Sequence, residues 1–339
     1  MSQEMGATTT TTMTTTATTT ANPVGRAFAR LLELTSRTES PVPLALFRIG
    51  TGLAMLWLVV PMLLTTVGRD VVTFAFLDRE SGGYRNLGGT WGADLLGGAT
   101  PDAIFGLLWL SALCGALMVV GVFGRVPILV AAVATRVALS QNMDVSGAGD
   151  ALLGNALLLL LLGDVTATLS LDCWLRTGGS GGKRRFVDDT PIAAWPRQLA
   201  VVQLCIVYTS TGLQKLVSMA WTPFDGFSAL YQILQSPHWA RFPDLMTDTG
   251  GALALPFSLL TAITIVWEVS FVVVLFRRRL RLLYALIGVG VHVGILVLME
   301  VGVFSIISIA FYPVLFSPQT LAAARDLRDR LQRRRRIAP

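Results

Sequence analysis

The sequence has few charged residues. Asp, Glu, Lys and Arg make up only 14% of its 339 residues, against about 25% in a typical soluble domain. Hydrophobic residues make up 53%, and the mean hydropathy is +0.62. The composition excludes an ordinary soluble domain and predicts an all-α polytopic membrane protein. The net charge of +6 is spread over short loops beside apolar runs, so it predicts no nucleic-acid partner.

Cysteine and histidine are also scarce. The chain has three cysteines and two histidines, in no Cys-x-x-Cys or Cys/His spacing. This predicts neither a metal site nor a disulfide framework. The N-terminus lacks the charged and then apolar order of a signal peptide. Residues 1–24 contain a threonine-rich tract that is too polar to bury a core, so we expect a disordered tail.

Long apolar runs fill most of the remaining sequence. A membrane-spanning helix needs about 20 apolar residues, and on this basis the chain is expected to have about eight transmembrane helices. Their expected ranges are 44–67, 103–123, 126–140, 149–169, 197–217, 252–276, 281–299 and 302–316. We assign residues 41–318 to one transmembrane domain, because no internal repeat divides it.

The basic residues predict the orientation of these helices. They are concentrated in alternate connecting segments, including Lys183–Arg185 and Arg277–Arg279, whereas the other loops contain few. Because basic residues favour the cytoplasmic side, both termini are expected to lie inside a cell membrane crossed many times. Residues 70–101, 141–148 and 218–251 would then face outward. Residues 25–40 are expected to form an interfacial amphipathic helix, and residues 319–339 a basic cytoplasmic tail, both contacting membrane lipids.

Ionisable residues within the apolar runs are costly and therefore informative. Arg48 and Glu268 fall toward the inner side, where we expect a structural ion pair between them or a polar network on that side that each of them joins. The others fall in the outer half or at mid-membrane: Arg136, Asp150, Lys215, Glu300 and His292. They predict either a polar cavity that opens outward or a set of snorkelling and helix-capping side chains. For His292 the alternatives are a buried neutral imidazole and a proton relay or ligand contact.

Lys215 has the most specific setting. It lies near the outer end of an apolar helix, and Tyr208 precedes it by seven residues on the same helical face. Trp221, Asp225 and Gly226 follow in a short broken segment. A lysine partly removed from water loses its proton more readily, which favours a base. The alternative is a lysine that only snorkels to the interface.

Several motifs resemble the HTTM domain, which is shared with vitamin K-dependent γ-carboxylases, and the chain is similar to bacterial members of that family. The motifs cover about residues 40–318 and are LALFRIGTGL, LSLD, IVYTSTGLQKL followed by W and DGFSALYQIL, and HVGILVLMEVGVFSIISIAF. The resemblance implies that Lys215 is the base that deprotonates a quinol cofactor, such as menaquinol or vitamin K hydroquinone. Trp221, Asp225 and Gly226 would shape the same site. The substrate implied is an exported peptide or a lipid.

The segment QNMDVSGAGDALL contains no histidine, although animal carboxylases have a functional histidine in this region; Asp144 and Asp150 are its only ionisable residues. Three functions are therefore considered. The first is a carboxylase-like membrane enzyme that uses Lys215. The second is a non-catalytic accessory protein for maturation or export of a secreted peptide. A transporter ranks last, because transporter folds usually contain internal repeats.

Overall fold

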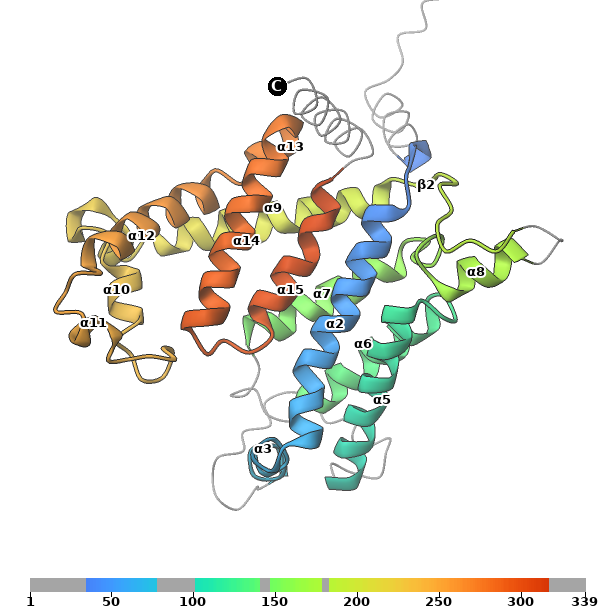
Figure 1. Ribbon diagram of the computed structural model, residues 1–339, viewed down its shortest axis with the longest axis horizontal. Helices are drawn as coiled ribbons and strands as arrows, with labels where there is room; N and C mark the ends of the chain where they lie inside the picture. Colours follow the sequence, from blue (N-terminus) through green and yellow to red (C-terminus); the bar gives the residue numbers. More distant parts are fainter. Residues whose placement is uncertain (1–34, 78–100, 141–146, 179–182, 317–339) are drawn as a thin grey trace, which may run out of the picture.

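The computed structural model describes residues 35–77, 101–140, 147–178 and 183–316, and these are mostly helical (Figure 1). The expected tail at 1–24, most of the expected helix at 25–40 and the basic tail at 319–339 lie outside the described residues, as do Asp144 and much of the outer loops. The longer helices are α2 (Val42–Leu64), α3 (Thr66–Leu77), α5 (Pro101–Val120), α6 (Val126–Leu139), α7 (Ala148–Leu161), α8 (Leu171–Gly178), α9 (Trp195–Lys215), α12 (Ala254–Val269), α14 (Arg281–Leu298) and α15 (Phe304–Phe311). The shorter elements are α10 (Ala229–Ile233), α11 (Leu245–Asp248), α13 (Val273–Phe276) and the 3-10 turns η2 (Met219–Trp221), η3 (Pro223–Asp225), η4 (Arg278–Leu280) and η5 (Tyr312–Leu315).

Three helical stretches are long and apolar enough to cross a membrane. They are Val42–Leu64, Asp102–Val120 and Arg278–Leu298. Shorter apolar helices cover Val126–Leu139, Ala148–Leu161, Ala254–Val269 and Phe304–Leu315. The composition therefore yields a helical protein with candidate membrane spans, as the sequence predicts at the coarse level.

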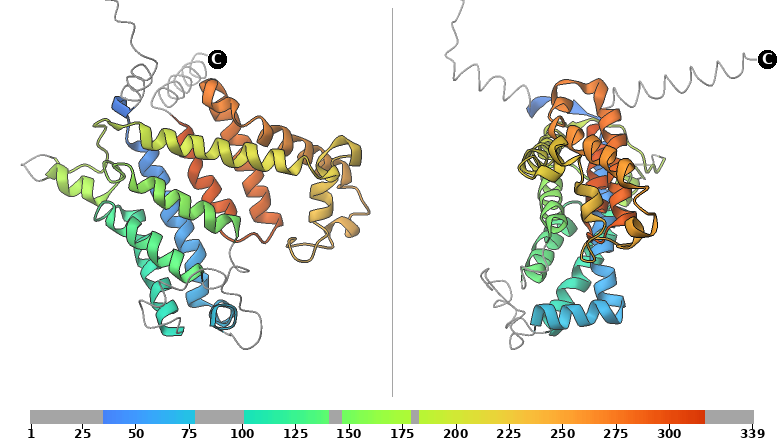
Figure 2. Two further views of the ribbon diagram at one scale, coloured as in Figure 1. Left: turned by 180° about the vertical axis from the view of Figure 1, so that it is seen from behind. Right: turned by 90° about the vertical axis from the view of Figure 1, so that its left-hand side faces the viewer.

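Helix α9 differs from the expected span at 197–217. It is not among the long apolar candidates, and it runs across the direction of α2 and α15 rather than alongside them (Figures 1 and 2). Polar residues occur along its whole length, from Arg197 to Gln214, and they lower its hydropathy. They also provide the side chains from which the candidate site is built.

Small residues allow the central helices to approach closely. A Cβ atom added at Gly52 of α2 would lie 2.8 Å from the carbonyl oxygen of Gly115 on α5. A Cβ atom added at Gly50 of α2 would lie 2.7 Å from Cβ of Ala310 on α15. This packing of small residues is typical of helices in membranes, where dispersion contacts replace the hydrophobic driving force between helices.

Two short strands close one end of the helical assembly. Strand β1 (Thr38–Glu39) pairs with β2 (Ile192–Ala193) in antiparallel register. The end of the expected interfacial helix at 25–40 is therefore extended backbone, because residues 38–39 pair with a partner about 150 residues away. The Glu39 carboxylate also accepts hydrogen bonds from two nitrogens of Arg197 at the start of α9.

Candidate functional site

Lys215, the last residue of α9, is held by two groups. Its Nζ donates to both carboxylate oxygens of Glu268 on α12, at 2.6 Å and 2.8 Å. The same Nζ lies 4.6 Å from the ring centre of Trp221, which supplies a cation–π contact. The lysine side chain is 30% exposed and that of Glu268 only 8%. An amine open to its surroundings is thus backed by an almost buried carboxylate.

Local sequence explains this geometry. Gly212 lies one turn before the lysine, and a Cβ there would be 2.8 Å from the backbone nitrogen of Val269 and 2.9 Å from Cβ of Glu268. The glycine therefore lets α9 and α12 touch at the level of the carboxylate. After α9, the Ser218 amide donates to the Lys215 carbonyl and the Trp221 amide to the Ser218 carbonyl. These turns fold η2 back so that the tryptophan ring covers the amine.

The expected ion pair between Arg48 and Glu268 is wrong. Glu268 pairs with Lys215 instead, at the level where Gly212 lets α9 and α12 approach closely. Arg48 is only 1% exposed and donates from Nη2 to the Leu169 carbonyl oxygen at 2.6 Å. Its Nε and Nη1 have no hydrogen-bond partner within the described part of the chain. Arg48 thus anchors α2 to the loop before α8.

A second polar group lies earlier on α9, in the interior. The Tyr208 hydroxyl is 2.8 Å from His292 Nε2 on α14 and 2.7 Å from the hydroxyl of Tyr312 in η5. The rings of Trp267 and Phe271 lie 4.6 Å from the Tyr208 ring. His292 Nδ1 is buried and lacks a partner among the described residues. His292 is therefore a buried imidazole hydrogen-bonded to Tyr208 of α9.

Tyr312 was missed by sequence reasoning. It follows α15 at the end of an apolar run and carries no local motif. A Cβ at Gly288 on α14 would overlap the Tyr312 hydroxyl, so this glycine makes room for the phenol. Glycine spacing around His292 was the one signal in the sequence that a side chain from another helix packs there.

Other expected site residues lie elsewhere. Arg136 is exposed on α6. Asp150 accepts a hydrogen bond from the Gly147 amide at 2.9 Å and so caps its own helix. Glu300 is exposed, and its backbone nitrogen donates to the Trp239 carbonyl oxygen. The structure does not bring these three carboxylate and guanidinium groups to Lys215. Each is accounted for as a surface or helix-capping residue.

Asp225 and Gly226 shape the turn that follows Trp221. The Asp225 carboxylate accepts hydrogen bonds from the Ser228 hydroxyl at 2.6 Å and from Gln232 Nε2 at 3.3 Å. Gly226 has a φ of +60°, a left-handed conformation that glycine adopts without steric cost. Gly226 therefore shapes the turn after η3, and Asp225 bonds Ser228 and Gln232 of α10 rather than the amine.

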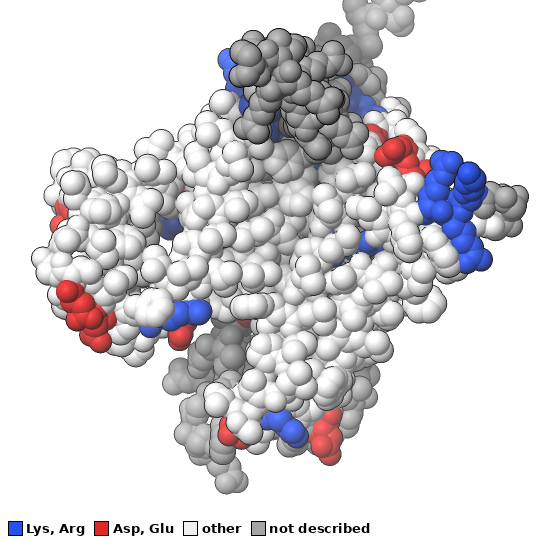
Figure 3. Space-filling view, viewed as in Figure 1, with Lys and Arg blue, Asp and Glu red and all other residues white. Residues whose placement is uncertain are grey.

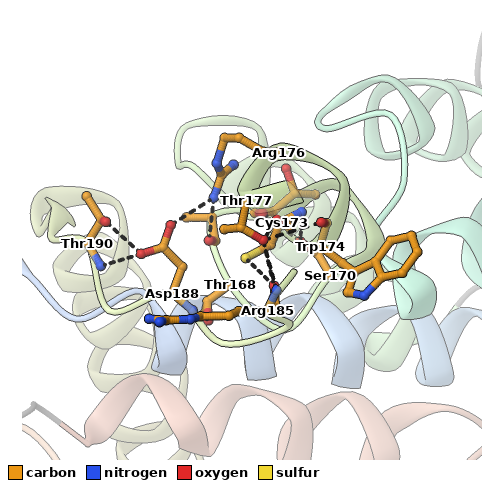
Figure 4. A network of polar contacts seen from close by, with 11 residues as sticks. Thr168, Ser170, Cys173, Trp174, Arg176, Thr177, Arg185, Asp188 and Thr190 are labelled. Atoms are coloured by element: carbon orange, nitrogen blue, oxygen red, sulfur yellow. Dashed lines mark hydrogen bonds and ion pairs between the residues drawn. The ribbon is translucent and has the colours of Figure 1, made fainter. Parts of the chain in front are cut away.

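A separate polar network surrounds α8 at another part of the molecule (Figure 4). Asp188 accepts hydrogen bonds from the hydroxyl and the amide of Thr190, at 2.6 Å and 3.0 Å, and from Arg176 at 3.3 Å. The Thr190 hydroxyl, the Thr190 amide and the Arg176 guanidinium hold the pKa of Asp188 below its ordinary value. A pocket of about 420 Å³ lies between this network and the start of α6, with Arg125 on its wall. The network ties the segment after α8 to the rest of the fold.

Comparison with known proteins gives no match: no family model, no curated protein and no solved structure is similar to this chain. Among the described residues, no group of three or more His, Cys, Asp or Glu side chains is placed to hold a metal ion. Any function is therefore inferred from the residues and their geometry.

Proposed function

We propose that this chain is a carboxylase-like protein of the cell membrane, with about eight spans and both termini inside. In this proposal Lys215 acts as a base toward a quinol such as menaquinol or vitamin K hydroquinone. The substrate to be modified is an exported peptide or a lipid. The observation that carries the proposal is the Lys215–Glu268 pair, in which a partly exposed amine is joined to a buried carboxylate.

The surroundings of the amine fit an apolar aromatic molecule. Val217, Met219 and Phe224 are 88%, 62% and 83% exposed and lie in the segment that follows the lysine. The Trp221 ring covers the amine, and its face can also stack against a ring system. A bound quinol would supply a weakly acidic hydroxyl group. Lys215 and Trp221 would hold its polar ring, and the exposed apolar side chains would hold its tail.

The ion pair provides a route for the proton. The proton shared between Nζ and the Glu268 carboxylate can move to the carboxylate, which leaves a neutral amine and a neutral acid. Burial reduces the advantage of the charged arrangement, because separated charges are poorly solvated there. The neutral Nζ then accepts a proton from the acidic hydroxyl. The pair finishes with one additional proton, and the donor oxygen keeps the electron pair of the broken O–H bond.

Substitution of Lys215 by arginine separates chemistry from structure. Arginine keeps the positive charge and can pair with Glu268, but it does not release its proton near neutral pH. With the full chain in vesicles and menadiol as the probe, we expect Lys215→Arg and Lys215→Ala to lower the rate of aerobic menadiol oxidation at least about 100-fold. Lys183→Arg, on the α8 side, is the matched control and should leave the rate unchanged. Full activity of Lys215→Arg would refute the base.

One observation favours a second function, that of a non-catalytic accessory protein for maturation or export of a secreted peptide. The Lys215 ammonium is paired with the Glu268 carboxylate and also lies against the Trp221 ring. Such contacts are expected of a lysine that only stabilises the end of its helix. In that case Lys215→Arg is mild, substitutions in residues 218–251 are severe, and a co-purifying peptide is chemically unchanged by mass spectrometry.

A further inference from the structure

We propose that α8 and the segment 183–187, together called the α8 hairpin, form an interfacial element that binds the headgroups of anionic phospholipids on the inner membrane surface. This inference depends on the proposed topology and is independent of any chemistry at Lys215. Four observations carry it: the attachment of α8 to the end of a candidate span, the contacts that order the hairpin, its exposed apolar side chains and its basic residues.

The first observation is the attachment. The candidate span Asp102–Val120 ends immediately before a tight turn. The Asp172 carboxylate at the start of α8 accepts hydrogen bonds from the amides of Phe123 and Gly124 in that turn, at 3.2 Å and 2.8 Å. The Asp172 amide donates to the Gly121 carbonyl at 3.1 Å. Helix α8 therefore begins where the span leaves the membrane.

The second observation is that the described residues of the hairpin are held together. The Leu169 amide donates to the Phe186 carbonyl at 2.6 Å. The Arg185 amide donates to the Thr177 hydroxyl at 2.9 Å. Side chains add to this: the rings of Trp174 and Phe186 stack at 6.0 Å. Residues 171–178 and residues 183–187 are thus fixed relative to one another, and the start of α8 is fixed to the turn after α5.

The third observation is the set of apolar side chains left uncovered. Phe123 is 66% exposed and adopts a φ of +63°, so a large ring is displayed from a conformation that such residues rarely adopt. Leu175, Phe186 and Val187 are between 50% and 55% exposed on the hairpin itself. Exposure of these side chains to water is unfavourable, whereas at a membrane interface they can be buried at the boundary between headgroups and acyl chains.

The fourth observation is charge. Lys183, Arg184 and Arg185 are exposed, and Figure 3 shows basic side chains gathered at the edge where α8 lies in Figure 1. Asp188 is occupied by Arg176 and Thr190, which leaves Asp189 as the remaining acid of the segment 183–190. Basic residues beside exposed apolar ones fit an anionic lipid surface, which attracts each Lys or Arg near it. A free phosphate would make no use of the apolar part.

Fluorescence of Trp174 can report on the contact between the hairpin and lipid, because the basic Arg184 lies 4.2 Å from its ring centre. The full chain is reconstituted in vesicles of phosphatidylglycerol and phosphatidylcholine, with bromine on the acyl chains of only one of the two lipids. Quenching of Trp174 is taken as the difference between the wild type and Trp174→Phe. Trp57, 53% exposed on α2, is measured in the same way with Trp57→Phe and serves as the reference within a span.

For Trp174 we expect quenching by brominated phosphatidylglycerol to exceed quenching by brominated phosphatidylcholine at least about twofold relative to the same ratio for Trp57. Replacing Lys183, Arg184 and Arg185 together by glutamine should bring the ratio down to that of Trp57. The charge-preserving variant Lys183→Arg, Arg184→Lys, Arg185→Lys should keep it. Absence of Trp174 quenching would refute the interfacial position, and equal ratios at Trp174 and Trp57 would refute the anionic preference.

Discussion

Removal of the Tyr208 hydroxyl should destabilise the protein more than removal of the Tyr312 hydroxyl. Tyr208 lies in the middle of the buried network, 2.8 Å from His292 Nε2 and 2.7 Å from Tyr312 Oη. Tyr208→Phe leaves both of those groups without this partner, and His292 Nδ1 already has none among the described residues. With two orphaned buried groups at about 1–3 kcal/mol each, we expect the free energy of unfolding to fall by about 2–6 kcal/mol.

Tyr312→Phe is the matched control, because it removes one hydroxyl of the same kind at the end of the network. Tyr208 then keeps its bond to His292, and the loss should be about 1 kcal/mol. Unfolding is followed by tryptophan fluorescence as the fraction of denaturing detergent in mixed micelles is raised, since Trp267 touches the Tyr208 ring. The double variant should lose less stability than the two single losses added together, because it no longer contains the Tyr312 hydroxyl that Tyr208→Phe leaves without a partner. A loss for Tyr312→Phe equal to or above that for Tyr208→Phe would refute this account of the network.

Three further predictions use contacts described above. Gly212→Ala should lower the free energy of unfolding by about 1–3 kcal/mol in the same assay, because the added Cβ would meet the α12 backbone. An unchanged stability would contradict the close approach of the two helices. Arg197→Met should lower the free energy of unfolding by about 3–5 kcal/mol, because it leaves the buried Glu39 carboxylate unpaired. Adding Glu39→Leu should restore much of that stability. If the double variant is no more stable than Arg197→Met, the pairing is contradicted. Because the pKa of Asp188 is lowered in the folded state, its contribution is present above the unfolded pKa and is lost as the pH falls through the folded pKa. The apparent Tm advantage of wild type over Asp188→Asn should therefore be seen at pH 7 and vanish in strong acid; an advantage independent of pH would contradict it.

The candidate site was only partly accessible from the sequence. Lys215 and Trp221 were expected to share a site, and the cation–π contact brings them together. The partner of the lysine was not expected, since Glu268 lies 53 residues away on another helix. Position along a helix can be estimated from the sequence, but the direction in which α12 presents its carboxylate cannot. That direction depends on the contact at Gly212, which involves two helices at once.

By itself, the sequence determined that the chain is mostly helical and has apolar stretches long enough to cross a membrane, because hydropathy and helix length are local properties. It also identified the ionisable residues that these stretches carry, since charge in an apolar run is visible without a fold. Only the tertiary structure decided their partners: Glu268 for Lys215, the Leu169 carbonyl for Arg48, and Tyr208 for His292. It also decided that α9 runs across its neighbours (Figure 2). Helix crossing and rotation arise from packing between residues far apart in the chain, and no local pattern contains that information.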